Sequence, residues 1–600
     1  METVLHDAHY LAGHAHRSIL WIYHLLRMSY IDWAVLTITL CSIVGYGVYK
    51  SRGAQSMQAY LLGNQSLPWY TVCLSVMATQ ASAITFLSAP GLAYTSGMSF
   101  VQFYFGLPLA MIVLCITFVP IFHRLKVYTA YEYLEQRFDL KTRALTAFLF
   151  LIQRGLSTGI TIYAPSIILS TILNIDTTYT TLFIGSLVVF YTVYGGTKAV
   201  SYTQLLQMSI IFCGLFAAGI MVVHLLPGNV GFEKAISIAG KMGRTNAIDF
   251  NFDWKNPYTV WSGIIGGFFL QLSYFGTDQS QVGRYLTGAS VSQSRLGLLM
   301  NGLVKIPMQF LILLIGVLVF TFYQYNKAPL FFNSYELNKL ENSAYGPELK
   351  KIKSDYDQAF ASKKQEVEKL DKVLDSKDQS QINQQRIAVK KADEETKAIR
   401  KNLTDLMIKN DPKAKTNGAT NDNNYIFLSF VTQYLPKGLI GLLIAIIFLA
   451  SMGSTASALN SLASTSVVDI YKRLINKEAD DKQYVKASRW ATLIWGVVCI
   501  IMALFTSKIG NLLEAVNILG SFIYGTILGV FIVAFYLKKI NGKSVFYGAI
   551  TAEIIVCICG YFEVVAYLWL NVIGCLLVVA FAFAFQNLIP KKAVEQFPTA

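Results

Sequence analysis

PKGLIGLLIAIIFLASMGSTASALNSLASTSVVDIYK, residues 436–472, decides the fold of this chain. The stretch has an apolar run from Leu439 to Leu449, followed by small and hydroxyl-bearing residues with no charge before Asp469. A helix surrounded by lipid favours Leu and Ile along its whole length, whereas small and hydroxyl residues favour close contact between helices. The stretch therefore predicts a membrane helix whose second half is packed tightly against other helices.

The same second half also offers oxygen atoms. Ala450, Gly453 and Ser454 share one helical face, where a backbone carbonyl and hydroxyl groups could converge on a small hard cation. Close packing without a ligand is the alternative interpretation of this pattern.

The rest of the chain has the composition of a membrane protein. Its 600 residues are 54% hydrophobic and 14% charged, and the mean hydropathy is +0.46. Runs of roughly 20 apolar residues, the length that crosses a bilayer, predict about thirteen spans. They lie near 30–49, 67–92, 99–122, 144–172, 179–196, 203–225, 258–282, 297–323, 436–468, 490–507, 511–536, 544–561 and 565–586. We therefore expect an all-α polytopic membrane protein.

The charge pattern predicts the orientation and the ends of the chain. The formal charge of +15 comes from Lys and Arg in alternate loops, which by the positive-inside rule places the N-terminus outside and the tail 589–600 in the cytoplasm. Residues 1–27, which hold five of the seven histidines, are interpreted as an extension ahead of the first span or as an interfacial segment. Spans one to eight occupy 28–325, and spans nine to thirteen occupy 431–588.

No enzymatic or metal chemistry is indicated by the residue patterns. All eight cysteines fall within predicted spans, so neither a disulfide framework nor a cysteine metal site is expected. Catalytic Ser, His and Asp sets and phosphate-binding loops are also missing from the sequence. We therefore expect no enzyme.

A second polar stretch, Ser75 to Gly97, is rich in Ala, Ser and Thr and contains Pro90. We expect its helix to be unwound near the middle, because irregular backbone at membrane depth persists only where it lines a cavity or site. The carbonyls of Ala78 and Ala81 are then further candidate cation ligands. A kinked packing helix is the alternative.

Two positive charges fall within predicted spans. Charges at such depth are costly and face a cavity or a partner. For Lys305 we favour the lining of a substrate cavity over structural pairing, and for Arg154 we favour pairing or snorkelling.

Residues 326–430 change composition and form an insertion between spans eight and nine. Residues 334–424 hold a tract of Lys, Glu, Gln and Asp with sparse apolar residues at helical spacing. We predict an extracytoplasmic helical hairpin stabilised by its own two arms, with a partly disordered loop as the alternative. An extracytoplasmic protein is a candidate partner for such a hairpin.

Three motifs together resemble the sodium/solute symporter family. They are YGGTKAVSYTQLLQ (194–207), where a glycine-rich loop is expected between two spans, FGTDQSQVGRYL (275–286) and SMGSTASALNSLASTSVVDIYKR (451–473). The resemblance implies a LeuT-type core of ten helices in two inverted repeats of five, here spans two to six and seven to eleven. It also implies alternating access and a co-transported sodium ion.

The resemblance also implies a sodium site, with one departure from the family pattern. The site falls on the carbonyls of Ala78, Ala81 and Ala450 and on hydroxyl side chains of span nine. Counting without gaps from Asn460, the family's pair of hydroxyl residues falls on Gly453 and Ser454, so one of the two is missing here. Thr455 or a water molecule is a candidate replacement.

A second departure lies at Gln204, where many relatives carry Asp in a position associated with a further sodium ion. We therefore expect one sodium per cycle. Carried over by position from relatives in the family, the resemblance also implies a substrate cavity lined by eight residues: Gln80, Ser82, Thr85, Tyr104, Gln271, Tyr274, Lys305 and Asn517.

The function implied is sodium-coupled import of a small polar organic solute, such as a sugar, a polyol or a sialic-acid-like compound, across the inner or plasma membrane. A monocarboxylate or amino-acid symporter is the alternative within the same class. A transporter-like membrane sensor is the alternative from another class, although no output domain follows the last predicted span. Nucleic acid is not an expected partner.

Overall fold

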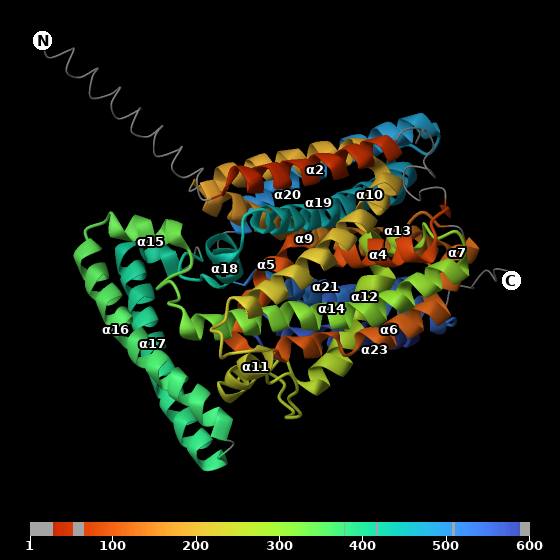
Figure 1. The fold of residues 1–600 in the computed structure, drawn as a ribbon. Helices are drawn as coiled ribbons and strands as arrows, with labels where there is room; N and C mark the ends of the chain where they lie inside the picture. The colour runs from red at the N-terminus through yellow and green to blue at the C-terminus, as the bar shows by residue number, and fades with distance from the viewer. Residues whose placement is uncertain are drawn as a thin grey trace, which may run out of the picture.

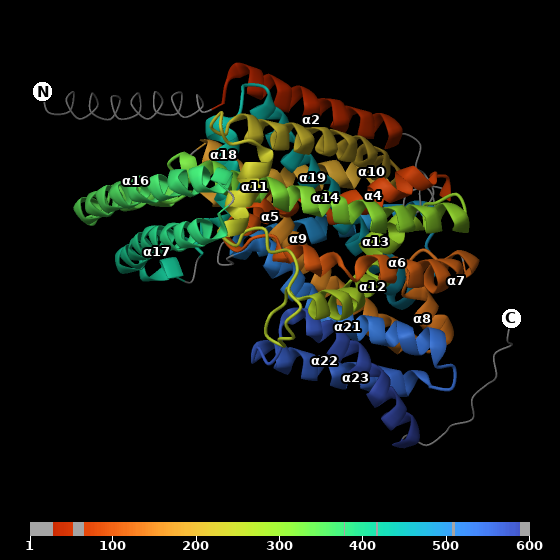
Figure 2. The same ribbon diagram turned by 60° about the horizontal axis from the view of Figure 1, so that its bottom comes forward.

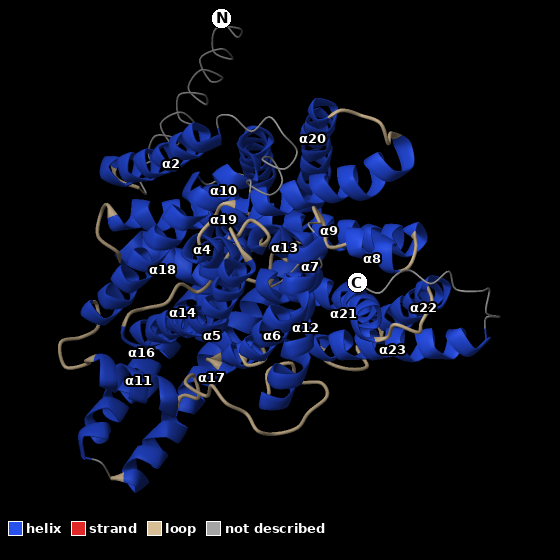
Figure 3. Cartoon of the chain, turned by 90° about the vertical axis from the view of Figure 1, so that its right-hand side faces the viewer, coloured by secondary structure: helices blue, strands red, loops and turns tan. Residues whose placement is uncertain are grey.

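The computed structural model describes residues 28–51, 65–125, 127–173, 175–376, 378–415, 418–506 and 511–588. The predicted extension 1–27 and tail 589–600 lie outside these residues. In the described part of the chain every regular element is helical (Figure 3), and β pairing is confined to an isolated parallel bridge between Leu67 and Gly288.

The helices of the first half run from α2 to α14, and most lie side by side in one bundle (Figure 1). They are α2 (Tyr30–Ser51), α4 (Trp69–Gln80), α5 (Ala83–Ser96), η2 (Ser99–Tyr104), α6 (Leu107–Val113), η3 (Leu114–Phe118), α7 (Val119–Leu125), α8 (Glu132–Arg137), α9 (Leu140–Leu173), α10 (Thr177–His224), α11 (Phe232–Lys241), η4 (Ser262–Gly266), α12 (Gly267–Thr277), α13 (Gln279–Tyr285) and α14 (Val291–Tyr325).

The second half starts with the insertion and returns to the bundle. Its elements are α15 (Ser334–Glu341), α16 (Gly346–Ser376), α17 (Gln379–Asn410), η5 (Pro412–Lys415), η6 (Asn423–Tyr425), α18 (Ile426–Tyr434), α19 (Leu439–Thr465), η7 (Ser466–Ile475), α20 (Asp481–Phe505), α21 (Leu512–Tyr536), α22 (Gly542–Tyr561) and α23 (Tyr567–Leu588). The boundary predicted between 430 and 431 falls inside α18.

Within the described residues, ten helices are long and apolar enough to cross a membrane, or eleven if α4 and α5 count as one bent span. The prediction of about thirteen spans is therefore too high by this measure. Span five, predicted at 179–196, coincides with the shorter apolar segment Thr177–Val193. Span seven, predicted at 258–282, starts as the π-helical turn η4, continues directly into α12 and is then separated from α13, because the backbone leaves the helix at Asp278. The loop predicted at 194–207 is also wrong, since α10 continues as a helix through it.

Helix α19 is the most enclosed span, as its small residues predict. Of its most apolar stretch, 89% of the residues are buried, compared with 22% in α2. It packs against α2, α4, α5, α9, α10, α13 and α20. Small side chains allow this number of close neighbours, so α19 forms the centre of the bundle.

The insertion folds as a helical hairpin in which α16 and α17 lie side by side and project from one end of the bundle (Figures 1 and 2). An apolar cluster joins the two arms to α15 at the base of the hairpin. It contains Leu330, Phe331, Leu340, Leu349, Tyr356, Leu403, Leu406 and Met407. Burial alone would raise the pKa of Asp393 between the arms, but Lys363 and Lys397 hold that pKa below its ordinary value. The prediction of a hairpin, rather than a disordered loop, is confirmed.

The prediction that the arms alone stabilise the hairpin is wrong, because the hairpin also docks on the bundle. On α11, Lys234 Nζ lies 2.9 Å from Asp371 Oδ1 and 3.0 Å from Asp375 Oδ2 of α16. At the base, Arg400 of α17 pairs with Asp422 at 2.6 Å, and Asp422 also accepts a hydrogen bond from the backbone of Phe332. Partly exposed ion pairs therefore hold the hairpin both near its turn, at the end of α16, and at its base.

Candidate functional site

A cavity of about 80 Å³ lies beside the break between α4 and α5. It is lined by Gln80, Ser82, Ile84, Thr85, Phe103, Tyr104, Arg154, Leu270, Tyr274, Leu513, Val516, Asn517 and Tyr524. Six of the eight predicted substrate residues are in this set: Gln80, Ser82, Thr85, Tyr104, Tyr274 and Asn517. Residues from α4, α5, α12 and α21, distant in the sequence, thus meet around one space.

The other two predicted residues lie next to this lining. Gln80 Nε2 donates a hydrogen bond to Gln271 Oε1 at 3.4 Å, and Gln271 Nε2 is buried without a protein partner. The Nζ of Lys305, on α14, lies 5.9 Å from the centre of the Tyr104 ring. Gln271 and Lys305 therefore adjoin the cavity rather than line it.

Sequence reasoning missed several lining residues. Arg154 was noted only as a buried charge in need of a partner, and Tyr524 carried no signal of its own. Leu513 and Val516 lie with the predicted Asn517 at helical spacing on α21, as one face of an apolar span does, so nothing in the sequence separates these two apolar residues from ordinary core residues.

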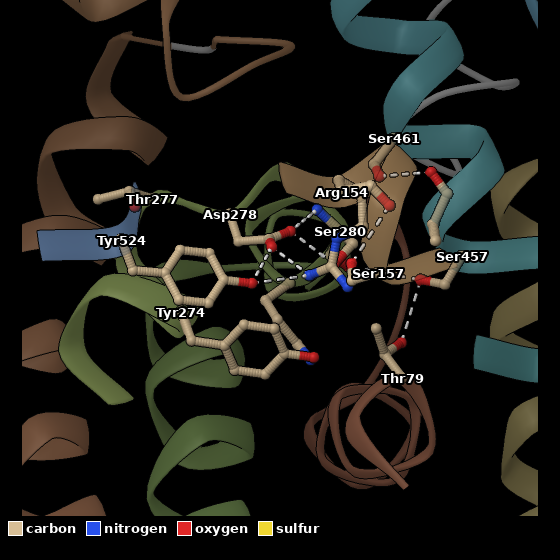
Figure 4. Close-up of polar contacts among 12 residues, drawn as sticks. Thr79, Arg154, Ser157, Tyr274, Thr277, Asp278, Ser280, Ser457, Ser461 and Tyr524 are labelled. Carbon is tan, nitrogen blue, oxygen red and sulfur yellow. Dashed lines mark hydrogen bonds and ion pairs between the residues drawn. The ribbon is translucent and has the colours of Figure 1, made fainter. Parts of the chain in front are cut away.

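The break between α12 and α13 is stabilised by a buried network (Figure 4). Asp278 caps α13, accepting hydrogen bonds from the backbone nitrogen and hydroxyl of Ser280 at 2.8 and 2.6 Å. Its other oxygen pairs with Arg154 of α9 and accepts a hydrogen bond from the Tyr524 hydroxyl at 2.8 Å. The pairing predicted for Arg154 is confirmed, and its partner is Asp278.

The break between α4 and α5 was predicted and is confirmed, with a bend of 62° between the two helices. Ala81 ends α4 with ψ at 82°, and Ser82 starts α5 without a side-chain cap. Helix α19 packs on both halves, and the Thr79 hydroxyl lies 3.1 Å from the Ser457 hydroxyl. The carbonyls of Ala78 and Ala81 therefore belong to a segment that lies against α19.

On α19, the candidate sodium ligands are buried. The Ser454 hydroxyl donates to the Ala450 carbonyl at 2.9 Å, and the Thr455 hydroxyl is buried without a protein partner. A cation with neutral oxygen ligands fits such a set. Among the described residues, no group of three His, Cys, Asp or Glu side chains could hold a metal ion instead.

Gly453 departs from the family pattern together with Gln204. The Gln204 amide donates to the Gly453 carbonyl at 3.1 Å and to the Thr79 hydroxyl at 3.2 Å, and its oxygen accepts from Ser75 at 2.6 Å. A Cβ atom at Gly453 would lie 2.5 Å from Gln207 Oε1. A larger residue here would require the Gln207 side chain to move, and the amide of Gln204 joins α10 to α4 and α19.

The sodium:solute symporter family matches residues 60–336 and 399–552, more than half of the chain, and the unmatched residues between them include most of the hairpin. The chain is 27% identical to the sodium/glucose cotransporter of Vibrio parahaemolyticus over 538 residues, which are 88% of this chain and 84% of that protein. It is 25% identical to the sodium/sialic acid symporter SiaT of Proteus mirabilis over 557 residues, 92% of this chain and 94% of the other.

A shorter match joins the chain to the human sodium/iodide cotransporter, 32% identical over 298 residues that span 49% of this chain and 45% of that protein. The fold matches the solved structure of a Na⁺-coupled sialic acid symporter in a substrate-bound, outward-open state, with a TM-score of 0.72 and 22% identity, covering 94% of this chain and 98% of the other. The chain therefore belongs to the sodium:solute symporter family, and it is a multi-pass membrane transporter for sodium and a small solute rather than an enzyme.

Proposed function

We propose that this protein imports a small polar organic solute together with sodium by alternating access. The observation that carries the proposal is the cavity at the α4/α5 break, where six residues assigned to substrate binding surround one space. Broken helices at the centre of a bundle expose polar backbone to a ligand, and this is the usual construction of a transporter site.

Sodium is held between the α4/α5 break and α19, by the carbonyls of Ala78, Ala81 and Ala450 and the hydroxyl of Ser454. The contact between Thr79 and Ser457, one residue and one helical turn away from these groups, supports the assignment. The bond from Ser454 to Ala450 stabilises the hydroxyl before sodium binds. Thr455 or a water molecule replaces the hydroxyl missing at Gly453. Bound sodium then favours the substrate-competent state, since a ligand shifts an equilibrium by its preference for one conformation.

One sodium moves per cycle in this proposal. The position that carries Asp in many relatives is occupied by Gln204, whose amide hydrogen-bonds to Ser75, Thr79 and Gly453. An amide satisfied by protein groups supplies no negative charge for a second cation, so a second sodium would lack a carboxylate ligand there.

The remaining assignments follow the same reasoning. The core consists of two inverted repeats, which start at the broken pairs α4/α5 and α12/α13. The protein lies in the inner or plasma membrane. Its hairpin is on the extracytoplasmic side, opposite the cytoplasmic C-terminus. The solute is a sugar, a polyol or a sialic-acid-like compound, with a monocarboxylate or an amino acid as the alternative. A partner outside the membrane is a further role for the hairpin.

The test is uptake into proteoliposomes made with the purified protein, under an inward sodium gradient and under a matched potassium gradient. A panel of labelled sugars, polyols and organic acids is offered in both. The proposal expects at least one of them to accumulate only with sodium. Equal uptake in potassium or choline buffer would contradict the proposal. No uptake of any solute in either buffer would contradict it as well and would favour a sensor.

A further inference from the structure

Two apolar grooves lie next to each other on the surface of the bundle, beside the short helix α11. The first, of about 520 Å³, is bordered by α11, the loop after it and α14. The second, of about 320 Å³, is bordered by α10, α11 and α14. Phe232 and Leu314 line both grooves, so the two spaces adjoin at these side chains. Phe232, at the start of α11, therefore lies between two apolar spaces.

The grooves open toward lipid rather than toward the solute cavity. Their linings share no residue with the lining of that cavity. Phe216, Phe232 and Phe310, which border the grooves, are 58%, 50% and 44% exposed. In the part of α10 between Val200 and His224, only 39% of the most apolar stretch is buried. Exposed apolar patches of this kind on a membrane protein are contact surfaces for lipid.

The grooves also have the depth of one leaflet. On α14 they extend from Phe310 to Leu318, which is about 12 Å at a rise of about 1.5 Å per residue. One leaflet contributes about 15 Å to a hydrocarbon core of about 30 Å. Helix α11 lies at the end of the bundle from which the hairpin projects (Figures 1 and 2), and its Lys234 pairs with Asp371 of the hairpin. The grooves therefore match an acyl chain in the leaflet on the hairpin's side.

Gly219 of α10 keeps the second groove open. It is part of the groove lining, and a Cβ atom at this position would lie 3.7 Å from Ile315, an ordinary van der Waals contact. Packing within the protein therefore does not require a glycine here. A glycine inside a helix is destabilising relative to alanine, and α10 continues as a helix on both sides of Gly219. The missing side chain instead leaves space for a molecule outside the protein.

The polar edge of the grooves carries a negative charge. Glu233 is the one charged residue in the two linings, and its side chain is exposed. Within the described part of the chain it forms no ion pair, because the neighbouring Lys234 is paired with Asp371 and Asp375 of the hairpin. A positively charged group of a bound molecule would therefore find a free carboxylate beside the apolar grooves.

We propose that the two grooves bind one diacyl phospholipid with an amine headgroup, with one acyl chain on each side of Phe232 and the amine at Glu233. The two chains of such a lipid fill both grooves, whereas a single-chain lipid would leave one of them empty. A cationic amine complements the Glu233 carboxylate, and an anionic headgroup would be repelled by it. Solute and sodium bind elsewhere, so this inference goes beyond the proposed function and does not rest on it.

The test is native mass spectrometry of the full-length protein, delipidated in detergent and titrated with dioleoylphosphatidylethanolamine. We expect one tightly bound molecule per chain and a melting temperature that rises with lipid concentration, since a ligand of the folded state stabilises it. Dioleoylphosphatidylglycerol, with the same chains and an anionic headgroup, should bind about threefold more weakly, the effect of an exposed ion pair. The single-chain lysophosphatidylethanolamine should bind more than about tenfold more weakly, because most of one buried chain is missing.

Two variants locate the lipid, each with a matched control. Gly219→Leu fills the second groove and should weaken binding of dioleoylphosphatidylethanolamine about tenfold, the effect of excluding about two buried methylene groups. Gly45→Leu is its control, since a Cβ atom at Gly45 of α2 would meet no atom of the described residues within 4 Å. Glu233→Gln should remove the preference for the amine headgroup. Glu368→Gln, at an exposed position on the hairpin, should leave that preference unchanged.

Three results would overturn the proposal. Equal binding of dioleoylphosphatidylethanolamine by Gly219→Leu and Gly45→Leu would show that the lipid does not occupy the grooves. Equal affinity of the wild type for the two headgroups would remove Glu233 from the site. A dimeric mass for the wild type that becomes monomeric in Gly219→Leu would show that a second copy of this chain covers the grooves instead of a lipid.

Discussion

The two broken helices, α4/α5 and α12/α13, are both interrupted within the bundle, but the polar groups at the two breaks are paired differently. At the α12/α13 break the polar groups are paired within the protein. Asp278 accepts a hydrogen bond from the backbone of Ser280, forms an ion pair with Arg154 and accepts a hydrogen bond from Tyr524. At Ala81 and Ser82 the interruption has no side-chain cap, and it adjoins both the cavity and α19. The comparison indicates that the α12/α13 break maintains the fold, while Arg154 and Tyr524 of its network also line the cavity, and that the α4/α5 break is the one left open to ligands.

The largest effect on stability is expected at the α12/α13 break. Asp278→Asn leaves the Arg154 charge buried without its partner, which costs about 3–5 kcal/mol. We expect a large fall in the melting temperature of the purified protein and in its folded yield. The double variant Arg154→Met with Asp278→Leu, which removes both charges, should recover part of the loss. Wild-type melting temperature in the single variant would show that this break is not maintained by the pair.

A smaller effect is expected at the ligand-binding break. Ser454→Ala removes one neutral oxygen from the proposed sodium site, and one hydrogen-bond-sized interaction of about 1 kcal/mol corresponds to a several-fold change. The sodium concentration for half-maximal uptake should rise by about that factor, with little change in melting temperature. Ser461→Ala is the control, because Ser461 lies nearly two turns from Ser454 on the same helix and its hydroxyl likewise donates to a carbonyl of its own helix, that of Ala458. Equal sodium dependence in both variants would remove Ser454 from the site.

How much of this could be predicted differs between the two breaks. Ala, Ser, Thr and Pro90 within a predicted span indicate the α4/α5 break directly, since such residues rarely face lipid. The ion pair of Arg154 with Asp278 joins residues 124 positions apart, and no local pattern selects that partner. The cavity residues came from a family resemblance, so Arg154 and Tyr524, absent from the transferred set, were missed.

The outer hairpin shows the same limit. Its helices follow from composition and spacing, but a lysine that pairs across an interface has the same sequence signature as one in water. Lys234, Asp371 and Asp375 could therefore not be recognised as a docking contact before the chain was folded. The predicted count of about thirteen spans exceeds the ten or eleven found among the described residues in part because a hydropathy run does not show where a helix breaks, as at Asp278.

The number of sodium ions transported per solute also tests the role of the α4/α5 break, because a second sodium ion would need a negatively charged ligand outside that break. With Gln204 in place of a carboxylate, charge movement and solute flux measured together should give one charge per neutral solute, or no net charge for a singly charged acid. Two charges per neutral solute would contradict the single site.

The smallest effect is expected outside both breaks, at the hairpin. Replacing 340–420 with a short Gly/Ser linker should leave proteoliposome uptake within about twofold, since changing the length of a flexible loop costs only about 0.6 kcal/mol per doubling. The lost docking contacts of Lys234 should lower the melting temperature slightly, because exposed ion pairs contribute about 0–1 kcal/mol each.

Comparison of proteoliposomes with whole cells at low solute concentration separates two roles of the hairpin. Loss of uptake in cells alone would indicate delivery by an outer partner. Loss in both, with the protein folded and inserted, would assign the hairpin to the transport cycle and contradict this prediction.

Equilibrium binding of radioactive sodium to the purified protein tests most directly whether the α4/α5 break is the ligand-binding one. The account predicts one saturable sodium per chain, not displaced by potassium and weakened several-fold in Ser454→Ala but not in Ser461→Ala. Absence of saturable binding, or sodium binding of equal strength in wild type and Ser454→Ala, would contradict it.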